Sequence, residues 1–215
     1  MNNDLESPSL SKTLQRANVE LTIAFDSTVE AFSRAMEMRE GEPLGHTRQV
    51  TEVTIGLARA IGIPTPEQLN IRRGAFLHDI GKMAVPETIL RKTGPLTAAE
   101  WVIMKQHPQH AYDLLSPIIF LHGAIDIPFC HQERWDGTGY PQGLMKNFIP
   151  LAARIFAVVD VWDALISDRP QRKAWSDAQA CDYLREQAGK LFDPQVVMVF
   201  LDDEIKKRVT RPLLI

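Results

Sequence analysis

The sequence predicts an all-α domain preceded by one long helix, and three features of the 215 residues support this fold class. Apolar residues recur with the three- and four-residue spacing of amphipathic helices over most of the chain. No convincing pair of segments alternates apolar and polar residues as paired strands would. Residues typical of helix starts and stops divide the chain into helix-sized segments. We therefore expect an irregular lead-in over residues 1–10, a single helix over 11–40 and one helical domain over 41–215.

The composition is that of an ordinary globular protein, with 45% hydrophobic and 24% charged residues. A net charge of -3 excludes the broad basic surface of a non-specific binder of polymeric nucleic acid. No run approaches the roughly 20 apolar residues of a membrane span, and the amino terminus lacks the pattern of a signal peptide. Cys130 and Cys181 fall in separate predicted helices, which argues against a disulfide framework. We therefore predict a cytoplasmic protein without membrane insertion.

The first helices are predicted from uninterrupted periodicity and from capping residues. Neither Pro nor Gly breaks the pattern from Ser11 to Arg39, and the length of this helix suggests that it also packs against a partner, as in a homodimer. A second helix is expected to begin near His46 and to end at Gly62. Thr65-Pro66-Glu67-Gln68 has the pattern of a capping box, and the helix that it opens is expected to reach Ile80 and to stop at Gly81.

The second half of the chain is predicted in the same way. A second capping box, Thr97 to Glu100, opens a helix to about His107, where Pro108 forces a new start. A helix to Leu115 and an apolar helix from Ile118 to His131 follow. Gln132 to Pro150 is a loop of about 19 residues, longer than the usual limit of about 12 to 15, and its apolar residues predict that it is packed. The apolar residues of this loop are Trp135, Tyr140, Leu144 and Phe148. A buried helix is expected from Leu151 to Ile166. The final two helices are expected to begin at a third capping box, Ser176-Asp177-Ala178-Gln179, and at Asp193-Pro194.

His78 and Asp79 are adjacent at the end of a predicted helix. Consecutive helical side chains diverge by about 100°, so both reach one object only if that object is a metal ion or cluster in a cleft open to both. Taken alone, such a pair is more often a helix-end pair without a ligand. The metal interpretation is favoured because further His and carboxylate residues lie near the ends of predicted elements, namely Glu42, His46, His107, His131 and Asp160.

Asp160 stands in a helix that is too apolar to face water, and a buried carboxylate needs a cation. A salt bridge to Arg154 or Arg169 is one solution, but a metal ion is favoured once the nearby histidines are counted. Nitrogen and oxygen ligands without thiolate suit Fe, Mn, Zn, Ni or Co. If Asp79 bridges two such ions, they can activate a water molecule against a phosphate ester.

Two groups of cations are candidates for binding phosphate. Lys82 follows Asp79 by three residues and can reach a phosphate oxygen, although a solvated surface lysine fits the local sequence equally well. Arg169, Arg172 and Lys173 could clamp a second phosphate or a guanine edge, and a solvated turn is the alternative. His110 and His122 are interpreted as surface or core histidines rather than metal ligands. His110 lies on the predicted helix after Pro108, and His122 lies in the apolar segment from Phe120 to Gly123.

Together these motifs resemble the HD superfamily of metal-dependent phosphohydrolases, and in particular its HD-GYP subfamily. The resemblance runs from about residue 31 to 200. It implies a helical bundle with two or three divalent metal ions, often Fe or Mn, in the core cleft, and hydrolysis of cyclic di-GMP to pGpG or GMP. The motifs are His78-Asp79-Ile80-Gly81-Lys82, His107-Pro108, Glu133-Arg134-Trp135-Asp136-Gly137-Thr138-Gly139-Tyr140-Pro141, Asp160-Val161-Trp162-Asp163-Ala164-Leu165 and Ser167-Asp168-Arg169-Pro170.

The resemblance also implies a role for individual residues. Asp79 and Lys82 would be catalytic, and Glu42 matches a carboxylate of members that hold a third metal. The implied partners are cyclic di-GMP, GGDEF-type proteins and a sensor or receiver. The implied metal ligands are Glu42, His46, His78, Asp79, His107, His131 and Asp160, and the implied substrate-binding residues are Tyr140, Asp163, Arg169 and Arg172.

The sequence departs from the subfamily pattern at several positions. Gln132 stands where a second histidine is usual, and because an amide oxygen binds first-row metals less well than imidazole, we expect a weak ligand there. Gln49 replaces an Arg, Ala111 replaces a Gly, and the segment from Glu40 to Gly45 differs from the common form. We also expect no receiver or sensor domain, which subfamily members usually carry, within these 215 residues. Two alternatives follow: a catalytically weak or inactive sensor that binds cyclic di-GMP, and an HD phosphohydrolase that acts on another nucleotide.

Overall fold

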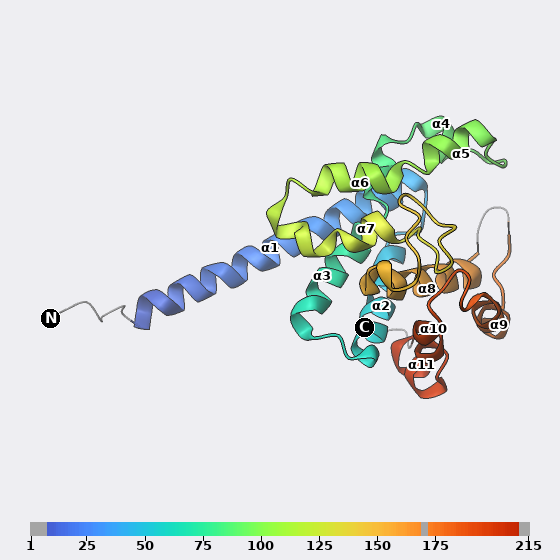
Figure 1. Ribbon diagram of the computed structural model, residues 1–215. Helices are drawn as coiled ribbons and strands as arrows, with labels where there is room; N and C mark the ends of the chain where they lie inside the picture. The colour runs from blue at the N-terminus through green and yellow to red at the C-terminus, as the bar shows by residue number, and fades with distance from the viewer. Residues whose placement is uncertain (1–7, 169–171, 211–215) are drawn as a thin grey trace.

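The computed structural model describes residues 8–168 and 172–210, and within these ranges the chain is helical without a named β-strand (Figure 1). The α-helices are α1 (Pro8–Glu40), α2 (His46–Ile61), α3 (Thr65–Phe76), α4 (Glu87–Leu90), α5 (Ala98–Met104), α6 (His107–Leu115), α7 (Asp126–Cys130), α8 (Leu151–Ile166), α9 (Asp177–Gln187), α10 (Pro194–Phe200) and α11 (Asp203–Val209). Short 3-10 helices are η1 (Ile80–Ala84), η2 (Ile119–Ala124) and η3 (Lys146–Phe148). The expected all-α class is confirmed.

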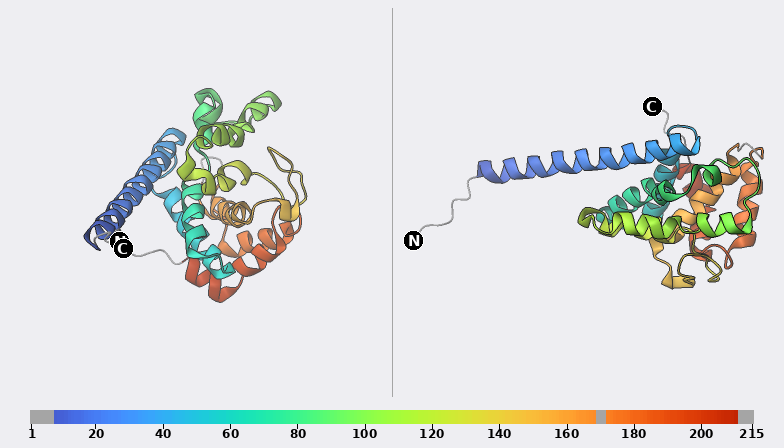
Figure 2. Two further views of the ribbon diagram at one scale, coloured as in Figure 1. Left: turned by 60° about the vertical axis from the view of Figure 1, so that its left-hand side comes forward. Right: turned by 90° about the horizontal axis from the view of Figure 1, so that it is seen from above.

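Helices α2 and α8 lie at the centre of the body. Helix α2 packs against α3 and α8, and α10 and α11 cover another side of α2. Helix α1 contacts α2, α3 and η1 near its C-terminal end, whereas its N-terminal part projects away from the other helices (Figure 2). None of the described helices is both long enough and apolar enough to span a bilayer.

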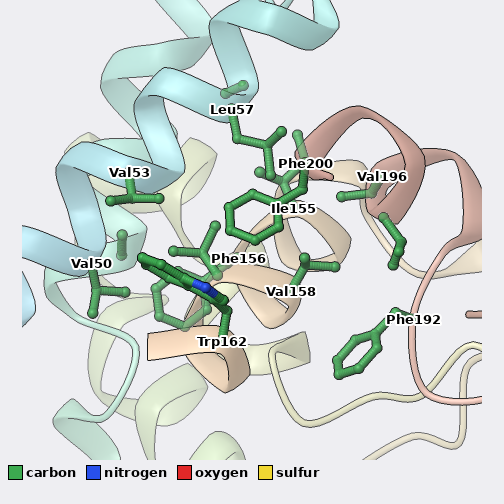
Figure 3. Close-up of a cluster of buried hydrophobic side chains, with 14 of the residues drawn as sticks. Val50, Val53, Leu57, Ile155, Phe156, Val158, Trp162, Phe192, Val196 and Phe200 are labelled. Atoms are coloured by element: carbon green, nitrogen blue, oxygen red, sulfur yellow. The ribbon is translucent and has the colours of Figure 1, made fainter. Parts of the chain in front are cut away.

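The larger apolar core joins α2, α8 and α10. Phe156 and Phe200 are completely buried, and Trp162 meets Phe200 edge to face with ring centroids 5.5 Å apart (Figure 3). Burial of each such side chain stabilises the fold by about 1.5 to 3 kcal/mol. Because α8 contributes side chains on several faces, the predicted burial of this apolar helix is confirmed.

A second apolar cluster joins α1 to α3, α6 and η2. Val29 of α1 packs with Phe76, Leu77 and Ile80 in this cluster. His78 lies between the two clusters. Its neighbours in sequence, Leu77 and Ile80, belong to the second cluster, and its ring contacts Phe156 of the larger core with ring centroids 4.8 Å apart. The segment that carries His78 and Asp79 is therefore held from both sides by apolar packing.

The predicted helix starts are partly confirmed. Thr97 and Ser176 each form the expected capping box, and Asp193 accepts a hydrogen bond from the amide of Gln195 at the start of α10. The capping box predicted at Thr65 is wrong, because helix α3 starts there after Pro64 and the side chain of Gln68 donates to the carbonyl of Ile63. A helix that was not predicted, α11, also follows α10.

The prediction that helix α3 runs to Ile80 and stops at Gly81 is wrong about where the helix ends. Helix α3 ends at Phe76, His78 and Asp79 lie in a turn, and Gly81 lies inside η1. Gly81 is required for a different reason, since a Cβ atom there would lie 1.9 Å from the carbonyl oxygen of His107. The glycine lets η1 pack directly on the start of α6.

The apolar segment from Ile118 to His131 is two short helices, η2 and α7, rather than one. Pro128 fits the first turn of α7 because its missing amide would have no partner there. In the long loop that follows, buried Glu133 accepts hydrogen bonds from the amides of Gln142 and Leu144. The packed loop is thus observed in this part, but Phe148 is 81% exposed and does not contribute as predicted.

Replacing Gly81 with alanine should destabilise the protein strongly. Overpacking typically costs about 1 to 3 kcal/mol and occasionally more, and here the clash is with a backbone carbonyl that cannot rotate away. We expect the free energy of unfolding in urea to fall by at least about 2 kcal/mol. Gly94→Ala is the control, because a Cβ atom there meets nothing within 4 Å. Equal stabilities of the two variants would contradict the close approach.

Candidate metal centre

Asp79, His107 and His131 place one ligand atom each within 4.8 Å of one another. Three elements bring them together: the turn after α3 carries Asp79, α6 begins at His107, and His131 directly follows α7. The Nε2 atoms of His107 and His131 each lie 3.6 Å from Oδ1 of Asp79, and 3.2 Å from one another. These three residues are far apart in sequence, so the group is a product of the tertiary fold.

His78 completes the group on the other side of Asp79. Its Nε2 atom lies 3.0 Å from Oδ2 of Asp79, and its ring meets that of His131 edge to face at 5.5 Å. Because the chain turns rather than continues as a helix at this point, two consecutive side chains reach one another. The sequence-based argument for their convergence rested on a helix, and the turn now provides the convergence directly.

Each of these three histidines has its Nδ1 atom against a backbone carbonyl. Nδ1 of His78 lies 2.8 Å from the oxygen of Ala75, and the matching distances are 2.8 Å for His107 with Met104 and 3.1 Å for His131 with Ile127. A carbonyl oxygen only accepts, so Nδ1 carries the hydrogen and Nε2 of a neutral ring offers its lone pair. This is the orientation that metal-binding histidines adopt.

The charges of Asp79, His78 and Lys82 shift one another's pKa values. Burial would raise the pKa of Asp79, but His78 and Lys82 outweigh it and hold the pKa well below its usual range. Burial opposes the charge on His78 as well, yet Asp79 raises the pKa of His78 to about 9. Burial lowers the pKa of His107 to about 4, so His107 is neutral at neutral pH and its lone pair is free.

The residues present fit a divalent metal ion. Oδ1 of Asp79 is buried and has no hydrogen-bond partner among the described residues, while two histidine Nε2 atoms face it. A buried carboxylate oxygen facing two lone pairs is unfavourable unless a cation lies between them. The proton that His78 holds beside Asp79 is displaced when such a ligand set takes up a metal. The group is therefore a candidate metal-binding site of nitrogen and oxygen ligands.

His46, the first residue of α2, forms a second group with two carboxylates. Its Nε2 atom lies 3.8 Å from Glu42 and its Nδ1 atom lies 3.4 Å from Oδ2 of Asp163. Glu42 is half-buried, whereas Asp163 is only 2% exposed. Glu42 and His46 therefore lie close together, and a buried carboxylate lies on the far side of the ring. The roles of Glu42 and His46 as metal ligands stay predictions.

Asp160 is half-buried in α8, and its charge is close enough to raise the pKa of His78. The alternative partner Arg154 is used elsewhere, because its guanidinium lies 2.6 Å from the carboxylate of Asp193. A salt bridge from Asp160 to Arg154 is therefore wrong, and the other alternative, Arg169, lies outside the described residues. The role of Asp160 as a metal ligand stays a prediction.

The predicted substrate-binding residues fall in different surroundings. Tyr140 lies beside the centre, with its ring 6.2 Å from that of His107 and burial raising its pKa to about 12. Nη2 of Arg172 donates to the carbonyls of Ala164 and Leu165, and the guanidinium lies over the ring of Trp175, while Nη1 is buried without a hydrogen-bond partner among the described residues. Asp163 is buried against His46, as described above. Their contact with a substrate stays a prediction, and Arg169 is not described.

The loop that carries the Gly139-Tyr140-Pro141 motif reaches the centre because Gly139 permits close packing of the loop backbone on itself. A Cβ atom at Gly139 would lie 2.3 Å from the amide nitrogen of Arg134. The amide of Tyr140 donates to the carbonyl of Gln132, which fixes the loop next to His131. Gln132 itself is half-buried at this position, and its predicted weak metal contact stays a prediction.

The sequence-based prediction missed two carboxylates near the end of α1. Glu40 lies 2.9 Å from Nζ of Lys82, which also lies 2.6 Å from Asp79, so Lys82 bridges two carboxylates. Glu37 is 2% exposed and accepts hydrogen bonds from backbone amides at the start of α2. The available signal was their position, because both fall on the face of α1 that also carries buried Val29 and Met36.

The fold and this centre define a helical protein with a buried cluster of histidine and carboxylate ligands beside a lysine. A family model described as HD domain matches residues 30–196, and the chain belongs to this family. It is 42% identical over 176 residues to the cyclic di-GMP phosphodiesterase response regulator RpfG of Xanthomonas campestris, covering 81% of this chain and 47% of that protein. It is 43% identical over 157 residues to the cyclic di-GMP phosphodiesterase PA4108 of Pseudomonas aeruginosa, covering 73% and 38%.

Other relatives differ in the substrate that their names give. A 3'3'-cGAMP-specific phosphodiesterase of Vibrio cholerae is 36% identical over 186 residues, covering 86% of this chain and 36% of that protein. Among solved structures, Bd1817, an HDG"Y"P protein from Bdellovibrio bacteriovorus, matches with a TM-score of 0.60 and 25% identity, covering 75% of this chain and 51% of that one. The chain therefore spans less than half of the length of these curated relatives.

Replacing Asp79 with asparagine should remove most of the bound metal. The amide keeps the shape of the side chain but removes the negative charge that faces His107 and His131. We expect elemental analysis of the purified variant to show at least one metal equivalent fewer than the unaltered protein. Asp113→Asn is the matched control, since Asp113 is exposed and, among the described residues, its carboxylate accepts a hydrogen bond only from Gln109. An unchanged metal content in the Asp79 variant would refute the assignment.

Proposed function

We propose that this chain is a metal-dependent phosphodiesterase that hydrolyses cyclic di-GMP to pGpG or GMP in bacterial second-messenger signalling. The observation that carries the proposal is the convergence of Asp79, His107 and His131, with the unpartnered Oδ1 atom of Asp79 between two imidazoles. The names of the relatives RpfG and PA4108 support cyclic di-GMP as the substrate. The chain covers only part of those proteins, so the activity is proposed for this domain.

The proposed roles follow from where the side chains lie. His78, Asp79, His107 and His131 would hold divalent metal, which supplies Lewis acidity and activates water when bound. Lys82 is next to Asp79, and although burial opposes its charge, Asp79 and Glu40 raise its pKa above the ordinary value. Lys82 thus stays positive and is placed to stabilise negative charge on a phosphate oxygen next to the centre.

We propose two or three divalent ions. Imidazole and carboxylate donors suit Fe, Mn, Zn, Ni or Co, and the resemblance to the HD-GYP subfamily favours Fe or Mn among them. His46 and Glu42 would serve a further ion beyond the Asp79 cluster, and Asp160 would be a ligand beside His78. Gln132 would give a weak ligand or none. The proposed location is the cytoplasm, and the proposed partners are a sensor or receiver module and GGDEF-type proteins.

A catalytically weak sensor of cyclic di-GMP is the second candidate. Gln132, in place of a strong ligand, favours it, and one nitrogen of the Arg172 guanidinium, Nη2, is already bonded to backbone carbonyls. The complete set of ligands around Asp79 with Lys82 favours the enzyme, because a binding module does not need it. A third candidate is the hydrolysis of another cyclic dinucleotide, favoured by the relatives named for 3'3'-cGAMP.

The deciding experiment is elemental analysis joined to an anaerobic turnover assay with added Fe(II) or Mn(II). Cyclic di-GMP and 3'3'-cGAMP are supplied in parallel, and linear dinucleotide and mononucleotide products are separated by chromatography. We expect two or more metal ions per chain and faster cleavage of cyclic di-GMP. One metal or none, with bound and uncleaved dinucleotide, would instead assign the chain to sensing.

We also propose that α1 pairs two copies of the chain as a coiled coil. An exposed and uncharged stripe follows the alternating four- and three-residue spacing of a coiled-coil seam. Because the stripe holds no charge, self-pairing brings no like charges together, and a second copy is the partner that matches it along its whole length. The stripe consists of Leu10, Leu14, Ala17, Leu21, Ala24, Thr28, Ala31 and Ala35.

Replacing Leu21 with arginine should convert a dimer to a monomer. Leu21 is 62% exposed in the single chain, so the substitution costs the monomer little but places a charge inside the seam. Light scattering after size exclusion measures the mass. Val19→Arg is the control, because Val19 is 53% exposed on the opposite side of α1. A monomeric unaltered protein would refute the pairing.

A further inference from the structure

Glu37 of α1 has a buried carboxylate that accepts hydrogen bonds from backbone amides at the start of another helix, α2. It is 2% exposed, although it stands on a helix with several exposed faces. Its Oε2 atom accepts from the amide of Gly45 at 2.9 Å, and its Oε1 atom accepts from the amide of Thr47 at 2.7 Å. A buried carboxylate must be satisfied by donors or cations, and both oxygens of Glu37 are satisfied by backbone amides.

These amides flank His46, the first residue of α2. Helix α2 has no side-chain cap of its own, since its N-cap is Gly45 in a left-handed conformation with φ of 91°. Glu37 thus does the work of the capping residue from a different helix, and its negative charge is favourable at the positive end of the α2 dipole. The backbone on both sides of His46 is held by one side chain.

The geometry of His46 depends on this backbone. The ring lies between Glu42 at 3.8 Å and buried Asp163 at 3.4 Å, so its two nitrogens face separate carboxylates. Asp163 comes from α8 and limits where the ring can lie, while Glu37 limits where the backbone can lie. A rotation of the first turn of α2 would move the ring away from both carboxylates.

The same end of α1 also holds the segment that carries Lys82. Arg39 donates to the carbonyl of Lys82 at 2.8 Å and to the carbonyl of Val85 at 2.8 Å. Glu40 contacts the ammonium of Lys82, as described above. Three residues of the last turn of α1 therefore fix the backbone beside His46 and both the backbone and the side chain of Lys82.

We propose that Glu37 is a positioning residue for the metal site that includes His46, acting by capping α2 from α1. The inference deepens the proposed function and rests on it, because it assigns Glu37 to the placement of His46, which is a proposed metal ligand. Glu37 contacts neither metal nor substrate and acts through the backbone of His46. Second-layer partners of metal ligands typically change affinity by about 10- to 100-fold when replaced.

The test compares Glu37→Gln, His46→Ala and Glu30→Gln in the full chain. The glutamine keeps the size of Glu37 but turns one acceptor into a donor that faces an amide. Glu30→Gln is the matched control, because Glu30 also joins α1 to the first turn of α2, but through the side chain of Arg48 rather than through a backbone amide. Equilibrium dialysis against Mn(II) gives the binding isotherm, and hydrogen exchange of the Thr47 amide in the metal-free protein reports the cap directly.

We expect Glu37→Gln to weaken, by about tenfold or more, the same Mn(II) equivalent that His46→Ala removes, and to leave the remaining binding unchanged. Exchange of the Thr47 amide should accelerate, whereas Glu30→Gln should match the unaltered protein in both measurements. Faster exchange with an unchanged isotherm would overturn the positioning role. So would a loss of all Mn(II) in proportion to the unfolded fraction, which would indicate a purely structural residue.

The inference and the proposed function fail in different ways. If the unaltered protein bound no Mn(II), the metal centre itself would be refuted, whatever the Thr47 amide showed. If it bound Mn(II) and His46→Ala removed one equivalent while Glu37→Gln removed none, only the role of Glu37 would be refuted.

Discussion

The carboxylate of Asp79 is the charge on which the rest of this structure depends. Its side chain is only 17% exposed, and its negative charge is balanced by His78 and Lys82 on one oxygen, while the other, buried oxygen faces His107 and His131. Each of these partners needs its own support, because a buried charge tolerates little displacement. The two apolar clusters on either side, and the close packing of Gly81 on His107, provide this rigidity.

Buried carboxylates that bind backbone amides recur around the centre. Glu37 holds the start of α2, and Glu133 holds the loop that carries Tyr140. In both cases one charged side chain accepts from backbone amides of another segment and thereby fixes that segment. Such anchors are expected near a site that must keep several ligands in place, since loops otherwise have many conformations of similar energy.

Helix α1 has two different parts. Its end is fixed to the centre through Glu37, Arg39 and Glu40, whereas its beginning projects from the body with an exposed apolar stripe (Figure 2). A helix is stiff along its length, so the two parts are mechanically connected. The projecting helix and the metal centre are therefore not independent elements of this fold.

The sequence by itself determined the helical class, the capping boxes at Thr97 and Ser176, the central apolar helix α8 and the candidate ligands, because these depend on local periodicity and residue chemistry. It did not determine the turn at His78, the split between η2 and α7, the exposure of Phe148, or the engagement of Arg172. Only the tertiary structure decided that Asp79, His107 and His131 converge, that Glu37 caps α2 and that Glu40 contacts Lys82. Contacts between distant segments set these features, and neither spacing nor propensity records such contacts.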